Sequence, residues 1–172
     1  MSDNQLNIAD RRLLGTEEVT VDDRGRIQLS VRKAEALGAD AACVVRPENC
    51  LVIYPKWRWD QIISELLVGP AFNPEMAELH RHIFGASEEG LSADKQGRLV
   101  LPSRGRLATA MHPGTKVLVI GMAASMEIWR IEDFNEYQRY QKAYREKERN
   151  EFRGIYDEAM RSVQRRDLGE YA

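Results

Sequence analysis

The sequence predicts an α+β fold made of two pseudo-symmetric halves, with two helices between the halves and a long helix at the C-terminal end. Three observations support this fold class. The chain of 172 residues contains an internal repeat. Each copy of the repeat alternates apolar and polar residues around glycine-containing turns, as half-buried strands do. The segments between and after the copies instead place apolar residues at helical spacing.

The repeat consists of two aligned blocks. Residues 19–37 align with residues 91–109, and residues 50–59 align with residues 125–134 after a short insertion in the second copy. Two copies are too few for a solenoid, in which repeats stack in series. They predict a domain with internal twofold pseudosymmetry, equivalent to a homodimer fused into one chain.

A motif Asp-x-x-Gly-Arg near the start of each copy predicts a tight hairpin turn. Apolar and polar residues alternate before it (19–21) and after it (27–29). Aspartate favours the first turn position because its side chain accepts hydrogen bonds from nearby backbone N–H groups, and glycine supplies the positive φ that closes the turn. The predicted turn residues are Asp22, Gly25, Asp94 and Gly97.

A short helix and a second hairpin follow the motif. Ser30 is a suitable N-cap for a helix over residues 31–37, and Gly38 is suited to end it. Two apolar runs joined by a turn then predict a hairpin. These runs are 42–46 and 50–54 in the first copy, and 116–120 and 126–129 in the second.

The remaining segments predict helices and one tail. Asn73-Pro74-Glu75 begins the second of two helices between the copies, with proline at the first helical position. Residues 132 to about 166 contain no proline and predict a long helix. The predicted division is a flexible tail (1–12), a first repeat (13–56), a two-helix spacer (57–85), a second repeat (86–131) and a C-terminal helical extension (132–172).

The composition fits a soluble globular protein. Hydrophobic residues make up 43% and charged residues 30% of the chain, which argues against general disorder. No apolar run approaches the ~18 residues of a membrane span, and the N-terminal residues lack the apolar stretch of a signal peptide. We therefore expect a cytoplasmic protein without a membrane partner. Cys43 and Cys50 match no zinc or redox spacing and are expected to be reduced core residues.

The sequence offers little support for an enzyme. It has no glycine-rich phosphate loop, nucleophile elbow or paired-cysteine motif. His80 and His82 are two residues apart and lie on different faces of a predicted helix, so we do not expect them to share a metal. Asp22 and Asp94 are equivalent carboxylates, but no base or nucleophile converges on them in the sequence. We expect no catalysis, no cofactor, no metal site and no small-molecule substrate.

Positive charge is concentrated in both copies although the net charge of the chain is −2. Segments 22–33 and 94–106 each contain more basic than acidic residues. Such side chains on a turn and near a helix N-terminus can reach phosphates or base edges. Two other interpretations remain open: a solvated surface, or a structural clip in which Arg26 pairs with Asp22 and Arg98 with Asp94. The candidate nucleic-acid contacts are Arg24, Arg26, Arg32, Lys33, Arg98 and Arg104.

The duplicated motif, with an apolar strand and a short helix after each copy, resembles the MraZ family of bacterial transcriptional regulators, within the wider AbrB-like group. The resemblance runs from about Leu14 to about Tyr137 and includes the Cys-Leu-Val-Ile-Tyr-Pro stretch at 50–55 and Glu-Ile-Trp at 127–129. The first copy departs from the pattern at Ser30, where such motifs usually carry proline. The C-terminal extension also exceeds the usual family length.

The resemblance implies a fold and a function. The fold is a swapped-hairpin (double-split) β-barrel formed by two AbrB-like repeats. The function is sequence-specific binding to repeated sites on double-stranded DNA, with repression of the division and cell-wall gene cluster, including the protein's own gene. The family forms homo-oligomeric rings, here expected to be an octamer or larger and associated with the nucleoid. Arg24 and Arg26 correspond to the DNA-contacting positions, and Arg32 and Lys33 are auxiliaries by charge and position.

The alternative is an oligomeric scaffold or protein-interaction module without DNA binding, which the long charged C-terminal helix favours. An AbrB-type antitoxin fits less well, because such proteins have a single copy and a disordered toxin-binding tail.

Overall fold

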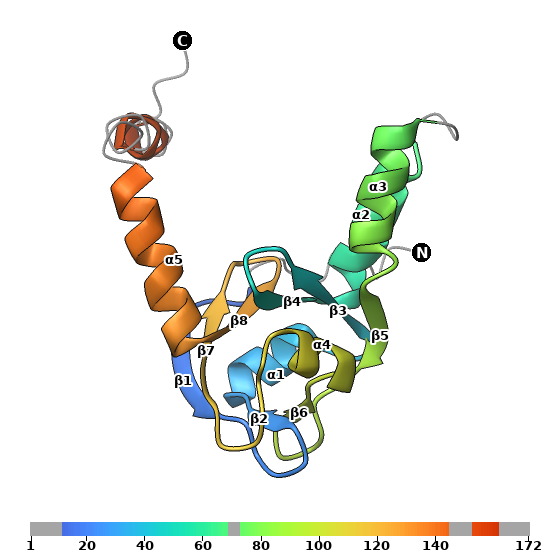
Figure 1. Cartoon of the computed structure of the whole chain (residues 1–172), viewed down its shortest axis with the longest axis vertical. Coiled ribbons are helices and arrows are strands. Elements are labelled where there is room, and N and C mark those ends of the chain that lie inside the picture. Colours follow the sequence, from blue (N-terminus) through green and yellow to red (C-terminus); the bar gives the residue numbers. More distant parts are fainter. Residues whose placement is uncertain (1–11, 69–72, 145–152, 162–172) are drawn as a thin grey trace, which may run out of the picture. The chain divides into compact units, whose positions relative to one another are not determined.

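The computed structural model describes residues 12–68, 73–144 and 153–161. The chain divides into two compact units, Met1–Asp133 and Phe134–Ala172. The first unit contains both repeats and combines antiparallel strands with helices (Figure 1). The predicted α+β class is therefore confirmed. The predicted N-terminal tail lies outside the described residues except for Arg12.

A six-stranded antiparallel sheet brings the two repeats together. Its strands lie in the order β1-β7-β8-β4-β3-β5. Strand β1 of the first repeat pairs with β7 of the second, and β5 of the second pairs with β3 of the first. Within the described residues β1 and β5 are edge strands, so a closed barrel is not observed. The strands are β1 (Thr16–Thr20), β3 (Ala41–Arg46), β4 (Cys50–Tyr54), β5 (Ser87–Leu91), β7 (Lys116–Gly121) and β8 (Met126–Arg130).

The hairpin predicted at each motif is only partly formed. Asp22 donates its N–H to the Arg26 carbonyl at 2.8 Å, so the chain does reverse there. The flanking segments then diverge, because Val21 N–H binds Thr115 O and Leu29 N–H binds Gly97 O, both in the second repeat. Each motif therefore forms a turn whose two arms pair with the other repeat.

The second arms of the two motifs form a separate antiparallel ribbon. It consists of β2 (Arg26–Gln28) and β6 (Arg98–Val100). Ile27 and Leu99 lie opposite each other and are 1% and 0% exposed. Burying a side chain of this size stabilises a fold by about 1.5–3 kcal/mol. One face of the ribbon therefore packs on the core, and the other face is at least partly exposed to solvent.

The short helices fill the space between sheet and ribbon. Figure 1 shows α1 (Val31–Leu37) and α4 (Ser103–Ala108) in this position. Ser30 caps α1 by accepting the N–H of Lys33, and Gly38 ends it at φ 68°. This agrees with the expected helix and both of its end signals.

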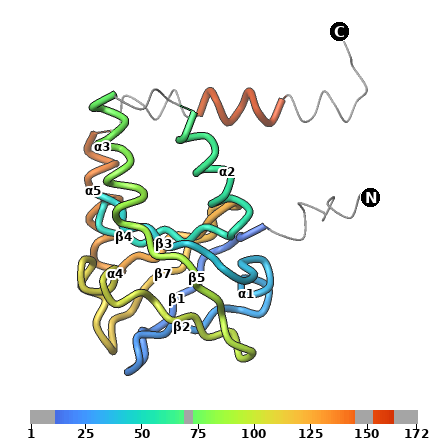
Figure 2. The backbone as a smooth tube through the Cα atoms, turned by 90° about the vertical axis from the view of Figure 1, so that its right-hand side faces the viewer, coloured from blue at the N-terminus to red at the C-terminus, as the bar shows by residue number. Residues whose placement is uncertain are grey.

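Two further helices pack on a smaller apolar cluster. They are α2 (Lys56–Leu66) and α3 (Pro74–Ile83), and Asn73 caps α3 as expected. Trp59 anchors α2, since its ring stacks on Tyr54 and meets Phe84 edge-on. Figures 1 and 2 show both helices on the opposite side of the sheet from the β2–β6 ribbon. The two-helix spacer thus leaves the ribbon uncovered.

The C-terminal region is helical wherever the structure describes it. Helix α5 spans Ile131–Tyr144, and residues 153–161 form a further helical segment. The rest of the predicted long helix lies outside the described residues. No described helix is long and apolar enough to cross a membrane. Cys43 and Cys50 are free and buried as expected, and burial raises the pKa of each thiol to about 12.

Candidate nucleic-acid interface

Each motif aspartate organises its own turn through three hydrogen bonds. Asp22 Oδ1 accepts the backbone N–H groups of Arg24 at 2.9 Å and Arg26 at 2.8 Å. Its Oδ2 accepts Nε of Arg26 at 2.7 Å. The carboxylate therefore fixes both the turn and the arginine that follows it.

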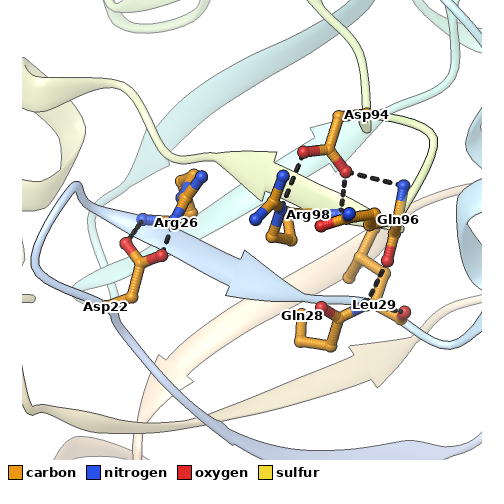
Figure 3. A network of polar contacts seen from close by, with 7 residues as sticks. All are labelled: Asp22, Arg26, Gln28, Leu29, Asp94, Gln96 and Arg98. Atoms are coloured by element: carbon orange, nitrogen blue, oxygen red, sulfur yellow. Dashed lines mark hydrogen bonds and ion pairs between the residues drawn. The ribbon is translucent and has the colours of Figure 1, made fainter.

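The second motif repeats this geometry. Asp94 Oδ1 accepts the N–H groups of Gln96 and Arg98, and Oδ2 accepts Nε of Arg98 at 2.7 Å. Figure 3 shows the two aspartate–arginine pairs towards opposite ends of the ribbon. The clip interpretation left open by the sequence is therefore the observed geometry for both Arg26 and Arg98.

The hydrogen bonds keep both carboxylates ionised. The backbone N–H of Arg26 lowers the pKa of Asp22, and the guanidinium of the same residue adds to the effect. The backbone N–H of Arg98 lowers the pKa of Asp94 in the same way. Carboxylates in this state are hydrogen-bond acceptors at neutral pH and are poorly suited to general acid catalysis.

The clip engages only one edge of each guanidinium. Asp22 binds Nε of Arg26, and no other side-chain partner of Arg26 is present among the described residues. The same holds for Arg98. The two Nη groups of each arginine thus keep their donors, while the Nε contact restricts the orientation of the guanidinium plane.

The outer face of the ribbon combines residues from both repeats. In this register Arg26 lies opposite Val100, and Gln28 lies opposite Arg98. Since side chains alternate along a strand, these four share the face opposite Ile27 and Leu99. The two motif arginines, distant in sequence, therefore belong to one surface.

Gln28 makes a contact between the two repeats that the sequence analysis did not identify. Its Nε2 donates to the Gln96 carbonyl at 2.7 Å and to the Leu29 carbonyl at 3.1 Å (Figure 3). The first repeat thereby holds the second turn. A signal was present in the sequence, because Gln28 lies two residues after Arg26 on a predicted strand and so shares its face.

The other predicted contact residues differ in their exposure to solvent. Arg24, Arg32 and Arg104 are exposed, and none has a carboxylate partner within the described part of the chain. Lys33 is buried at 3% exposure, and its Nζ donates to Glu17 Oε1 at 2.8 Å. Lys33 therefore does not present its charge to a partner, in contrast to the expectation.

The burial of Lys33 follows from its helical position. Lys33, Ala36 and Leu37 are the buried residues of α1 and occupy the i, i+3 and i+4 positions of one face. Burial raises the pKa of Glu17, but hydrogen bonds from Lys33 and Ser30 and the charge of Lys33 outweigh it, and the net pKa is lowered. The ion pair is thus a structural element between β1 and α1.

The histidines provide no metal site with their neighbours. His80 Nε2 lies 3.1 Å from the Leu66 carbonyl, and His82 Nδ1 lies 3.4 Å from Glu78. Among the residues the structure describes, no group of three or more histidine, cysteine or acidic side chains could hold a metal ion.

Comparisons with known proteins agree with the duplicated architecture. The model of the "MraZ protein" family, described as antitoxin-like, matches this chain twice, over residues 13–82 and 84–153. Relatives named "Transcriptional regulator MraZ" include one from Limosilactobacillus fermentum, 31% identical over 73% of this chain and 85% of the relative. Another from Moorella thermoacetica is 30% identical, and one from Heliobacterium modesticaldum 29% identical, each over 72% of this chain and 85% of the relative.

Proposed function

The chain belongs to the MraZ family, and we propose on this basis that it is a sequence-specific DNA-binding transcriptional regulator and not an enzyme. The observation that carries the proposal is the β2–β6 ribbon, which is buried on one face and presents two clipped arginines on the other. The major groove of DNA admits a two-stranded β-ribbon, so a surface of this shape has a natural binding site there.

Arg26 and Arg98 are the proposed base-reading residues. A guanidinium whose two Nη groups are available can donate bidentate hydrogen bonds to O6 and N7 of guanine. The Nε contact to Asp22 or Asp94 fixes the guanidinium before DNA arrives, which reduces the conformational entropy lost on binding. Arg26 in the first repeat is expected to contribute most, as the family resemblance implies.

The exposed arginines without carboxylate partners are the proposed phosphate contacts. Arg24 projects from the first turn, Arg32 belongs to α1 and Arg104 to α4. Phosphate contacts position a protein on the duplex and supply most of its salt-dependent affinity. Lys33 is left out of the proposed set because it is buried and paired with Glu17.

The finer features implied by the family are also part of the proposal. The chain would repress the division and cell-wall gene cluster, including its own gene, from a cytoplasmic, nucleoid-associated ring of eight or more subunits. Several subunits engaging repeated sites would raise the total affinity by avidity without a large contact area per subunit. The swapped-hairpin barrel and the division into repeats at 13–56 and 86–131 belong here as well, supported by the exchange of β1 and β5 between repeats.

The direct test is fluorescence anisotropy with DNA from upstream of the protein's own gene and with scrambled DNA, each at two salt concentrations. We expect selective binding of the upstream DNA and a steep loss of affinity with salt, as released counterions require. Equal affinity for both DNAs at both salt concentrations, from a folded oligomer, would reject the proposal.

A scaffold that binds proteins instead of DNA is the second candidate. The observation that favours it is a pair of exposed aromatic residues in the second unit. The rings of Tyr140 and Tyr144 stack with their centroids 4.6 Å apart, and the two residues are 57% and 72% exposed. Exposed apolar groups of this kind are typical of protein-interaction surfaces. The same anisotropy measurement separates the candidates, because the scaffold predicts no preference for upstream DNA.

A further inference from the structure

We propose that Arg106, from the second repeat, contacts a DNA phosphate at the first turn, so that both repeats build the first DNA-contact site. This inference rests on the proposed function, since it assigns a further residue to the same surface. Arg106 belongs to α4 and lies far from Gly25 in the sequence. The fold brings the two together.

The guanidinium of Arg106 lies directly against the backbone of the first turn. A Cβ atom placed on Gly25 would come closer than 3.0 Å to Cζ, Nε and Nη2 of Arg106. Real Cβ atoms do not approach other atoms this closely, so a side chain at Gly25 would displace the guanidinium of Arg106 from this position. The glycine of the first motif therefore has two roles: it adopts φ 75°, and it admits an arginine from the other repeat.

A short relay of hydrogen bonds holds Arg106 in place. Leu101 donates its N–H to the Gly25 carbonyl at 3.0 Å, and the Leu101 carbonyl accepts Nε of Arg106 at 3.1 Å. Leu101, the residue after β6, thus links the turn to the arginine.

The remaining donors of Arg106 are uncommitted. Within the described residues, its Nη groups have no hydrogen-bond acceptor and the side chain has no carboxylate partner. The side chain is part-buried, so its position is restrained. A guanidinium that is fixed through Nε and keeps its two Nη groups has the geometry for bidentate binding of a phosphate.

The local charge also favours an anion at this position. Arg24 is exposed two residues before Arg26 on the same turn, and Asp22 is already paired with Arg26. Arg106 adds a third guanidinium beside Gly25 of the same turn. The other acidic side chain of this turn, Asp23, is exposed and has no cationic partner in the described structure. A phosphate at this turn would meet more positive than negative charge.

The second turn has no equivalent arginine. The repeat alignment places Ala34 where Arg106 would be required, and Gly97 is approached instead by the Gln28 amide and the Leu29 carbonyl. A neutral amide and a carbonyl oxygen offer no charge to a phosphate. The two motifs, which look equivalent in sequence, therefore present different groups to a phosphate: the first turn has the positioned guanidinium of Arg106, and the second has the exposed ammonium of Lys95.

The test uses the full chain with Arg106→Gln and Arg106→Lys, and a duplex carrying one binding repeat. Arg106→Gln should weaken binding to the repeat and to scrambled DNA by a similar factor, about tenfold. It should also reduce the slope of log K against log salt by about 1. Arg106→Lys should keep the wild-type slope, because the charge is retained. Arg81→Gln, an exposed arginine on α3, is the matched control and should leave both quantities unchanged.

A phosphate scan gives a second, independent readout that uses folded wild-type protein. Neutral methylphosphonate is substituted for one phosphate at a time along the repeat. One substitution should weaken wild-type binding and have little further effect on Arg106→Gln, whereas Arg106→Lys, which retains the charge, should remain sensitive to it. Absence of such coupling at every position would overturn the inference.

Two other outcomes are decisive. Weaker binding by Arg106→Gln with an unchanged salt slope would show that Arg106 only supports the turn, and the inference would fail while the proposed function stands. Wild-type protein without selectivity for upstream DNA would instead remove the proposed function itself.

Discussion

Gln28 of the first repeat lies directly opposite Arg98 of the second in the β2–β6 ribbon, and its side chain holds the turn that precedes Arg98. The two motifs are therefore coupled through a side chain that neither motif contains. This coupling determines how firmly the second turn is held.

Removal of this contact in Gln28→Ala should destabilise the protein by about 1 kcal/mol, the usual net value of a neutral hydrogen bond. Amide hydrogens of the second turn should exchange faster than in the wild type, while those of the first turn are unaffected. Thermal unfolding and hydrogen exchange measure the two effects. Gln61→Ala on α2 is the matched loss of an exposed glutamine amide and should change neither turn.

Arg26→Ala should abolish selective DNA binding without changing the oligomer, because each bidentate arginine–guanine contact contributes about 1–3 kcal/mol of discrimination. Arg26→Lys separates charge from geometry. It keeps the positive charge but loses the planar pair of donors, so selectivity should fall while the salt slope is retained. Anisotropy with native and scrambled DNA checks both variants, and normal selectivity in Arg26→Ala would contradict the site assignment.

The ion pair between the buried Lys33 and the partly exposed Glu17 predicts unequal effects of its two partners. Glu17→Gln leaves a buried ammonium without its counter-charge and should cost about 3 kcal/mol. Lys33→Met removes the charge and fills similar space, so it should cost less. Chemical unfolding gives both values. Folded Lys33→Met should bind DNA like the wild type, and a clear loss of affinity would mean that Lys33 reaches the DNA after all.

The motif aspartates predict a defined acid dependence of stability. Asp22 and Asp94 have folded pKa values below their ordinary value of 3.8. Each therefore stabilises the fold above that value, and this contribution is lost as the pH falls through the lowered folded pKa. The stability gap between wild type and Asp22→Asn/Asp94→Asn should be constant near neutral pH and close below about pH 3.8. Melting curves across this range test it, and a constant gap at every pH would contradict the role of the carboxylates.

Alanine at the two motif glycines should have different consequences. Both glycines have positive φ, 75° at Gly25 and 79° at Gly97, which strains alanine by about 1–2 kcal/mol. At Gly97 the new Cβ would also meet the Leu29 carbonyl at 2.9 Å, and a backbone atom cannot easily move. At Gly25 it would meet only the flexible end of Arg106.

Gly97→Ala should therefore lower the melting temperature more, and Gly25→Ala should lower DNA affinity more by displacing Arg106. Gly114→Ala is the control for the strain of positive φ, because Gly114 has φ 88° and no atom lies within 4 Å of the position that its Cβ would take. Equal melting temperatures for Gly25→Ala and Gly97→Ala would show that the Leu29 carbonyl adapts.

Local sequence signals were sufficient to predict most elements and the chemistry of the motif turns. Ser30 and Gly38 cap the two ends of α1, Asn73 caps α3, and the β3–β4 hairpin forms between the expected residues. The Asp22–Arg26 pair was foreseeable as well, because its atoms come from one turn. Caps, turns and alternation depend on neighbours within a few residues, so local order along the chain is sufficient to predict them.

Which segments pair with each other became visible only in the folded protein. The first arm of each motif pairs with the other repeat, Lys33 turns inward to Glu17, and Arg106 lies over Gly25. The repeat alignment predicts equal turns, yet the amide of Gln28 donates a hydrogen bond to the second turn, whereas the guanidinium of Arg106 lies against the first. These relationships depend on which surfaces the packed core brings together, and residues distant in sequence have no local pattern that records their partner.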